Sequence, residues 1–228
     1  MATIADNLQL VRARINQACS RVGRRAGSVN LLAVSKTFPA EKVREAFHAG
    51  QHSFGENYVQ EAIDKIAELS DLRSQIEWHM IGPLQSNKTR VVAENFDWVH
   101  TIDRLKIAQR LNEQRPGHFP PLQVCIQVNT SGEASKSGIA PQEALALALA
   151  VRELPHLKLR GVMALPAPST DPEIQRDALM RVKSIFDMLN NKGMPLDILS
   201  MGMSADLEPA IEVGSTMLRV GTALFGNR

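Results

Sequence analysis

The chain has 228 residues, of which 44% are hydrophobic and 22% are charged, and its formal net charge is +2. This length fits one α/β barrel, and the composition is that of an ordinary globular protein rather than a disordered or fibrous one. A charge so close to neutral gives no electrostatic reason to expect binding to nucleic acid or to an anionic membrane.

The N-terminal segment predicts a helix rather than a targeting signal. Apolar residues recur at helical spacing from Ile4 to Val22, so one stripe of this helix is expected to be buried. The segment lacks the continuous apolar stretch of a signal peptide, and no run reaches the roughly 20 apolar residues that cross a bilayer. We therefore expect a cytoplasmic protein. Cys19 and Cys125 form no CxxC pair and are expected to be buried thiols.

After a turn over residues 23–28, short β-type runs alternate with longer helical runs. The predicted strands are Asn30–Lys36, His52–Gly55, Glu77–Ile81, Trp98–Ile102, Leu122–Asn129, Lys158–Ala164, Leu196–Ser200 and Met217–Val220. The predicted helices between them include Ala40–Ala49, Asn57–Leu69, Arg104–Gln114, Pro141–Leu154 and Glu173–Asn190.

Several of these strands are apolar on both faces, as in LLAV and VCIQV, which is typical of a parallel sheet covered by helices. Eight strands at this spacing favour a closed (β/α)8 barrel, the TIM barrel, over an open doubly wound sheet. No GxGxxG or Walker motif follows a strand, which removes the best reason to prefer the open sheet. We predict a single α/β domain over residues 1–228. The N-terminal helix is expected to cover the seam that the short tail after the last strand leaves.

Ligands of such barrels bind at the carboxyl ends of the strands, and the first strand ends in Lys36. An amine that closes an apolar strand is partly desolvated, which frees its lone pair for a carbonyl carbon. The alternative is a lysine that simply reaches solvent at the mouth of the barrel.

The segments MGMS and RVGT end the last two strands and combine small residues with hydroxyls. Gly202 and Gly221 let backbone amides approach an anion, and Ser204 and Thr222 can donate hydrogen bonds to it. The loops after strands seven and eight are a recurrent phosphate site in these barrels, although ordinary turns are the alternative. An amine opposite an anion site fits an aldehyde that carries a phosphate.

Several long motifs carry a resemblance to a known family. AVSKT, FGENYVQE, WHMIGPLQSNK, SKSG and the closing GMSADLEPAI and GSTMLRVGTALFG segments resemble the pyridoxal 5′-phosphate (PLP) homeostasis proteins, also known as YggS-type or proline synthase co-transcribed proteins. The resemblance covers essentially the whole chain. It implies the barrel of alanine racemase, the fold-type III arrangement of PLP proteins.

The resemblance also implies roles for individual residues. Lys36 would hold PLP as an aldimine, and Asn57 would lie beside the cofactor ring. Ser204, Gly221 and Thr222 would contact the phosphate with help from the backbone of Met201, Gly202 and Met203, and Arg219 would face the pyridine nitrogen.

An arginine at the pyridine nitrogen has a chemical consequence. A guanidinium can only donate hydrogen bonds, so the nitrogen stays unprotonated and the ring is a weaker electron sink than one that faces a carboxylate. The alternative is that Arg219 merely pairs with a nearby acid. We expect a monomeric PLP-binding protein that is not an enzyme and that takes part in PLP homeostasis, where it can deliver PLP to apo-enzymes.

The rival interpretation is a small PLP-dependent racemase or lyase that uses Lys36 alone or with Tyr58, the only tyrosine. We expect Tyr58 to be exposed or packed instead. Lys136 in GEASKSG and Lys65 in its predicted helix are first interpreted as solvated charges. The alternatives are that Lys136 is a loop lysine that meets PLP or a partner, and that Lys65 has a role because its helix begins at the site. His79 and His100 in their strands are interpreted as core histidines, because supporting metal ligands are missing from their surroundings in the sequence. 

Overall fold

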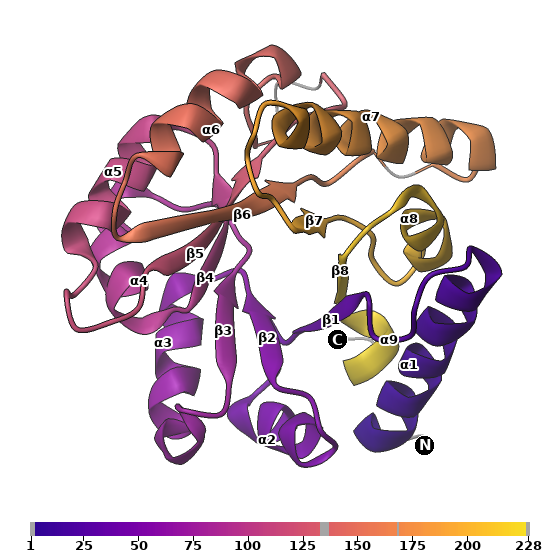
Figure 1. Cartoon of the computed structure of the whole chain (residues 1–228). Coiled ribbons are helices and arrows are strands. Elements are labelled where there is room, and N and C mark those ends of the chain that lie inside the picture. Colours follow the sequence, from indigo (N-terminus) through magenta and orange to yellow (C-terminus); the bar gives the residue numbers. More distant parts are fainter. Residues whose placement is uncertain (1–2, 133–136, 168, 227–228) are drawn as a thin grey trace.

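The computed structural model describes residues 3–132, 137–167 and 169–226. Their eight parallel strands close into a barrel in chain order, with helices around it (Figure 1). The strands are β1 (Asn30–Val34), β2 (Ser53–Glu56), β3 (Glu77–Met80), β4 (Trp98–Ile102), β5 (Leu122–Gln127), β6 (Leu157–Met163), β7 (Ile198–Ser200) and β8 (Met217–Val220). Because β1 pairs in parallel with both β2 and β8, the sheet has no free edge, and the prediction of a (β/α)8 barrel is confirmed.

Helices connect successive strands and form the outer layer. They are α1 (Ile4–Arg21), α2 (Ala40–His48), α3 (Val59–Glu68), α4 (Thr89–Asn95), α5 (Leu105–Gln114), α6 (Ala144–Arg152), α7 (Pro172–Asn191), α8 (Leu207–Val213) and α9 (Thr222–Phe225). Short 3₁₀ turns are η1 (Ser70–Leu72), η2 (Ser86–Lys88) and η3 (Pro141–Glu143). None of the helices described in the three ranges above has the length and apolar character that crossing a membrane demands.

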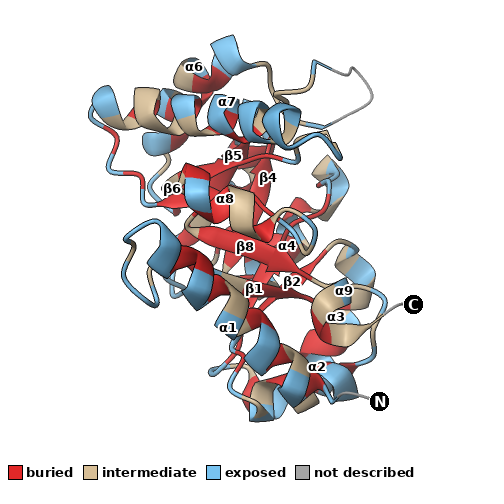
Figure 2. Ribbon diagram, turned by 90° about the vertical axis from the view of Figure 1, so that its right-hand side faces the viewer, coloured by how far each residue is buried: buried red, intermediate tan, exposed pale blue. Residues whose placement is uncertain are grey.

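Helix α1 covers the seam between β8 and β1, as predicted. Thr3 and Asp6 form a capping box at its start, and Leu8, Val11 and Ile15 lie on its buried stripe. The helix packs against α8, α9 and α2, so it occupies the place of a closing helix after β8 (Figures 1 and 2). Among the described residues after β8, the chain forms the four-residue α9, which is too short to cover that wall.

The strands present two different faces. Their outward side chains and the buried helix stripes form one large apolar cluster, and the strands are buried at the centre of the molecule (Figure 2). A second, smaller cluster fills the barrel interior and consists of Leu32, Val34, Ile81, Trp98, Cys125, Met163, Ile198 and Met217. This alternation follows the two-residue period of a strand. Both cysteines are buried free thiols, as expected.

Several predicted boundaries were wrong by a few residues. The strand predicted to run to Lys36 ends at Val34, because Thr37 adopts a left-handed conformation with φ 68° and turns the chain. The helix predicted from Pro141 begins as a 3₁₀ turn and becomes α-helical at Ala144. The prediction of one domain over residues 1–228 stays a prediction.

Candidate functional site

A cavity of about 510 Å³ opens at the carboxyl end of the barrel. Its lining brings together seven of the nine residues predicted to bind the cofactor: Lys36, Asn57, Met203, Ser204, Arg219, Gly221 and Thr222. They come from the ends of β1, β2, β7 and β8, which are neighbours in the closed barrel. Apolar side chains of Val34, Ile81 and Leu165 complete the wall. A small apolar cavity with a few convergent polar groups is typical of a cofactor site.

The two other predicted residues, Met201 and Gly202, lie behind this lining. The Met201 side chain is fully buried in the outer cluster. Gly202 has φ +94°, and a Cβ atom there would lie 2.5 Å from Ala210 Cβ, so glycine is required by packing as well as by backbone conformation. Met203 N–H donates to Asp206 Oδ1 at 2.6 Å, so this amide already has a partner. The predicted help from the Met201–Met203 backbone stays a prediction.

The residues on either side of Lys36 are tied to helix α3. Lys65 Nζ donates to the backbone oxygen of Ser35 at 2.7 Å, and Thr37 N–H donates to Glu61 Oε1 at 2.5 Å. Lys65 Nζ also donates to Glu61 Oε1 at 2.6 Å. The turn that carries Lys36 is therefore held from both sides by one side-chain cluster. This anchoring offsets the cost of about 1–3 kcal/mol for a left-handed threonine.

The prediction that Lys65 lies on a solvated face was wrong. Its side chain is only 6% exposed and donates to Glu56 Oε1 at 2.8 Å. The helical spacing correctly paired Glu61 with Lys65, but the spacing could not reveal that Glu56, at the end of β2, lies on the same side. Burial raises the pKa of Glu56, and Lys65 opposes that rise. Glu56 Oε2 has no hydrogen-bond partner in the part of the chain that the structure describes.

Asn57 reaches the cavity through a close backbone contact. A Cβ atom on Gly82 would lie 2.1 Å from the backbone oxygen of Asn57, so only glycine fits at the end of β3. Thr101 Oγ1 donates to the backbone oxygen of Gly82 at 2.8 Å and fixes the contact from the other side. The Asn57 Oδ1 atom is buried and has no hydrogen-bond partner among the described residues, and Asn57 is one of the residues that line the cavity. An orphaned amide of this kind is available to a bound molecule.

Arg219 makes no ion pair with the described residues. Its Nη1 donates to Ser200 Oγ at 2.7 Å and its Nη2 to the backbone oxygen of Ala164 at 2.9 Å. Arg219 is only 5% exposed, and this burial lowers the pKa of its guanidinium to about 10. The alternative that Arg219 merely pairs with a nearby acid is therefore not supported. Its remaining N–H groups are available at the cavity wall.

The other residues singled out in the sequence lie apart from this set. Tyr58 is 56% exposed and is not among the residues that line the cavity. Lys136 lies outside the described residues. His79 and His100 are fully buried, as expected for core histidines, and the described part of the chain contains no cluster of metal-ligating residues.

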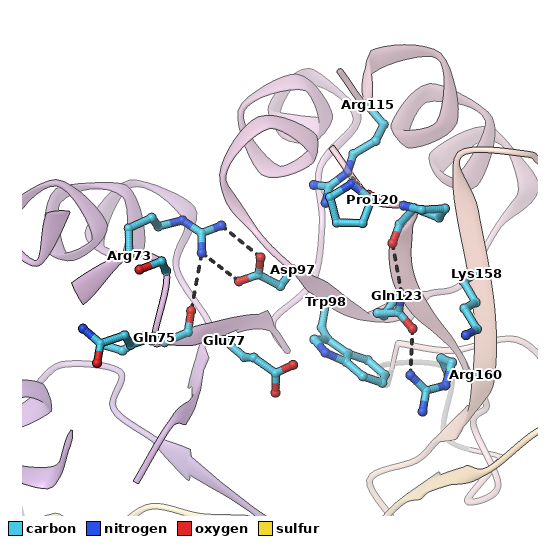
Figure 3. Close-up of a pocket in the computed structure, with 13 residues that line it drawn as sticks. Arg73, Gln75, Glu77, Asp97, Trp98, Arg115, Pro120, Gln123, Lys158 and Arg160 are labelled. Carbon is cyan, nitrogen blue, oxygen red and sulfur yellow. Dashed lines mark hydrogen bonds and ion pairs between the residues drawn. The ribbon is translucent and has the colours of Figure 1, made fainter. Parts of the chain in front are cut away.

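A second cavity, of about 530 Å³, opens at the opposite end of the barrel (Figure 3). Its arginines are already occupied: Arg73 pairs with Asp97, and Arg160 pairs with Asp197 and lies over the Trp98 ring. Arg115 donates to the backbone oxygens of Ala93, Phe96 and Pro120. These contacts lock the amino ends of the strands together. We therefore assign the functional site to the carboxyl end, where barrel ligands bind.

The residues that line the cavity at the carboxyl end of the barrel fit a phosphorylated aldehyde. Lys36 supplies an amine, Ser204 and Thr222 supply hydroxyls, and Arg219 supplies a donor that forms no ion pair with the described residues. Glycine at position 221 allows a close approach to β1, because a Cβ atom there would lie 3.2 Å from the backbone oxygen of Val34. The donors and the orphaned amide of Asn57 together match the amine-reactive and anionic parts of such a molecule.

Fold and site together define a class of protein, the barrels of the alanine racemase type. The family model "Alanine racemase, N-terminal domain" matches residues 6–228. The pyridoxal phosphate homeostasis protein of Pseudomonas aeruginosa is 58% identical over 228 residues, covering 100% of this chain and 97% of that protein. Its counterpart in Escherichia coli K12 is 55% identical over 229 residues, covering 100% of this chain and 98% of that protein.

A solved structure agrees with these relatives. PipY from Synechococcus elongatus PCC7942, with PLP bound, superimposes with a TM-score of 0.86 at 36% identity, covering 98% of this chain and 100% of that chain. The chain belongs to the family of pyridoxal phosphate homeostasis proteins, and the resemblance seen in the sequence is confirmed.

Proposed function

We propose that this protein binds PLP reversibly at Lys36 and serves in intracellular PLP homeostasis. The observation that carries the proposal is the meeting of Lys36 with Ser204, Thr222 and Arg219 around one cavity. The family relatives named for this role and the PLP-bound PipY structure support it.

The chemistry needs only a deprotonated amine. The Lys36 nitrogen attacks the aldehyde carbon of PLP, a carbon–nitrogen double bond forms, and the aldehyde oxygen leaves as water. Hydrolysis reverses the step and returns the aldehyde. The hydroxyls of Ser204 and Thr222 orient the phosphate, and Asn57 contacts the ring. The protein thereby keeps a reactive aldehyde in a bound form that can be released.

We further propose that the bound PLP is stored rather than used for catalysis. The described lining of the cavity contains two ionisable side chains, Lys36 and Arg219, and Arg219 can only donate. Racemisation needs a base on each face of the substrate carbon, and the exposed Tyr58 lies outside this lining. This arrangement favours a PLP carrier over the rival racemase or lyase.

Borohydride reduction followed by peptide mass mapping tests the site. Reduction turns the double bond into a stable amine, and we expect a phosphopyridoxyl group on the peptide that contains Lys36. Modification of another lysine in its place would overturn the assignment. The Lys36→Ala variant should lose the visible absorbance of bound PLP, whereas Lys106→Ala, on the outer helix α5, should keep it.

The exchange of α-protons separates storage from catalysis. The protein loaded with PLP is incubated with amino acids in deuterated water, and deuterium at the α-carbon is followed by NMR. We expect no exchange above that of free PLP. Turnover at rates typical of enzymes, roughly 1–10³ per second, would establish the racemase or lyase instead.

Three finer expectations belong to the same proposal. The protein would act in the cytoplasm, as a monomer, and would pass PLP to apo-enzymes that depend on it. Light scattering at micromolar concentration measures the molar mass in solution and tests the prediction of a monomer. Direct delivery is tested by mixing the loaded protein with a PLP-free enzyme. We expect the enzyme to be activated faster than the loaded protein releases PLP into solution.

A further inference from the structure

The interior of this barrel contains a connected line of polar side chains below the cavity. Bulky apolar residues usually fill such an interior, yet His79, His100, Ser200 and Arg219 are all buried there. They come from β3, β4, β7 and β8 and share the inward-facing strand positions with the apolar interior cluster. Burying four polar side chains is costly unless they satisfy one another.

Three hydrogen bonds join these residues end to end. Arg219 Nη1 donates to Ser200 Oγ at 2.7 Å, and Ser200 Oγ lies 3.2 Å from His100 Nδ1. His100 Nε2 lies 2.9 Å from His79 Nδ1. The line therefore runs from the wall of the PLP cavity down through the barrel, and the far side of His79 approaches Glu77 at 4.0 Å.

The arginine fixes the direction of its own bond, and the serine hydroxyl then favours one direction for the other two. A guanidinium only donates, so Ser200 Oγ must accept from Arg219. The Ser200 hydroxyl hydrogen can then be donated to His100 Nδ1, which accepts it in this arrangement. A neutral His100 with an unprotonated Nδ1 carries its proton on Nε2 and donates it to His79 Nδ1. His79 in turn carries its proton on Nε2.

The opposite direction satisfies fewer groups. If His100 Nδ1 donated to Ser200, the serine hydroxyl hydrogen would have no acceptor among the described residues. His79 Nε2 would then be a buried lone pair with no hydrogen-bond partner. In the first direction the same atom is an N–H that faces the Glu77 carboxylate, which attracts it. The first direction is therefore favoured at both ends of the line.

Both histidines are suited to remain neutral. Burial, and to a smaller extent the charge of Arg219, lowers the pKa of His100 to about 3. Burial and the neighbouring His100 lower the pKa of His79 well below its ordinary value. Neither ring therefore takes up the second proton that would reverse the bonds at neutral pH.

We propose that Ser200, His100 and His79 form a one-way hydrogen-bond chain that positions Arg219 for the pyridine nitrogen of PLP. The inference rests on the proposed function for the identity of the ligand. Ser200 and the backbone oxygen of Ala164 hold Nη1 and Nη2 of the guanidinium, which fixes its plane and directs its remaining hydrogens. The two histidines act only through Ser200 and are positioning residues.

Nitrogen-15 NMR of the imidazole rings tests the direction without PLP. We expect His100 and His79 to be neutral and to carry their protons on Nε2 from pH 6 to pH 8. A proton on His100 Nδ1 would overturn the proposed chain. The Ser200→Ala variant removes the hydroxyl that donates to His100 Nδ1. The nitrogen-15 chemical shift of His100 Nδ1 should therefore move toward that of an imidazole without this hydrogen bond.

Affinity for PLP tests the positioning role. Ser200→Ala and His100→Phe each remove a link, and we expect each to weaken PLP binding about 10- to 100-fold, the range for a lost hydrogen bond to a charged group. His100→Gln retains an acceptor toward Ser200 and a donor toward His79, so it should restore binding to within about threefold. Met217→Leu, in the apolar part of the same interior, is the matched control and should bind PLP normally.

The possible outcomes separate this inference from the proposed function. If His100→Phe is folded and binds PLP as tightly as the wild type, the positioning role is refuted while PLP binding stands. If the wild type binds no PLP, the proposed function fails, and the positioning of Arg219 for PLP fails with it. Should His100→Phe not fold, the comparison of Ser200→Ala with Ser200→Thr, which keeps the hydroxyl, gives the same decision.

Discussion

The side-chain nitrogen of Lys65 lies 2.7 Å from the backbone oxygen of Ser35, the residue directly before Lys36. Lys65 also pairs with the buried Glu56 at the end of β2. The strand that leads to Lys36, the proposed PLP-binding lysine, and the strand that leads to Asn57 are therefore joined by one buried cation. This contact makes the geometry of the site depend on a residue that does not line the cavity.

Replacing Lys65 tests this dependence. Lys65→Met leaves Glu56 buried without its partner, so we expect a loss of about 3–5 kcal/mol in the free energy of unfolding. The double variant Lys65→Met with Glu56→Gln removes both charges and should lose less than the sum of the single changes. Urea unfolding measures the effect. Strictly additive losses would contradict the coupling.

The matched control for Lys65 is an exposed pair at the same helical spacing. Arg90 and Glu94 lie on α4, with the Arg90 side chain 68% exposed. Arg90→Met should change the free energy of unfolding by less than about 0.5 kcal/mol, because exposed pairs contribute little. PLP affinity should fall in Lys65→Met and remain unchanged in Arg90→Met.

Gly82→Ala should disturb the site through the backbone of Asn57. The new Cβ atom would overlap the Asn57 carbonyl, so the end of β2 must move. We expect a loss of about 1–3 kcal/mol in stability, typical of overpacking, together with weaker PLP binding. Gly117→Ala is the control, since a Cβ atom there meets nothing within 4 Å. Equal behaviour of the two variants in urea unfolding and PLP titration would refute this role of Gly82.

The proposed phosphate contacts can be separated from the proposed covalent contact by comparing two aldehydes. Ser204→Ala and Thr222→Ala each remove a hydroxyl at the cavity wall. We expect each to weaken PLP binding about tenfold, as for a hydrogen bond to a charged group, and to leave the affinity for pyridoxal, which lacks the phosphate, nearly unchanged. Absorbance titration with both aldehydes measures this. Equal losses for both would place the phosphate elsewhere.

The buried histidines should make the fold sensitive to acid. The pKa of His100 is about 3 in the folded protein and about 6.5 in an unfolded chain, so the unfolded state binds more protons between these values. The stability is fully present above pH 6.5 and falls as the pH drops toward 3, by up to about 1.4 kcal/mol per pH unit for each such histidine. Urea unfolding from pH 7.5 to pH 4.5 measures the slope.

His100→Gln provides the comparison for this slope, because it removes one titrating group and keeps the hydrogen-bond chain. We expect a smaller loss of stability per pH unit than in the wild type. His118→Gln, at an exposed position, is the control. An unchanged slope in His100→Gln would show that other groups cause the acid sensitivity.

Much of the fold and part of the site follow from the sequence alone. The alternation of short β-type runs with longer helical runs predicted eight strands and the longer helices, and the order of strands in a parallel barrel placed Lys36, Ser204 and Thr222 at one end. The long motifs then identified the family. These features are local, or they repeat along the chain, so a pattern in the sequence is enough to predict them.

Only the tertiary structure decided which polar residues meet inside the molecule. Lys65 looked solvated because its own helix offered charged neighbours, whereas Glu56 comes from the preceding strand. His79 and His100 looked like isolated core histidines until β7 and β8 brought Ser200 and Arg219 beside them. Periodicity predicts the face on which a side chain lies. The barrel's closure and register determine its partner, because partners from distant strands leave no spacing in the sequence.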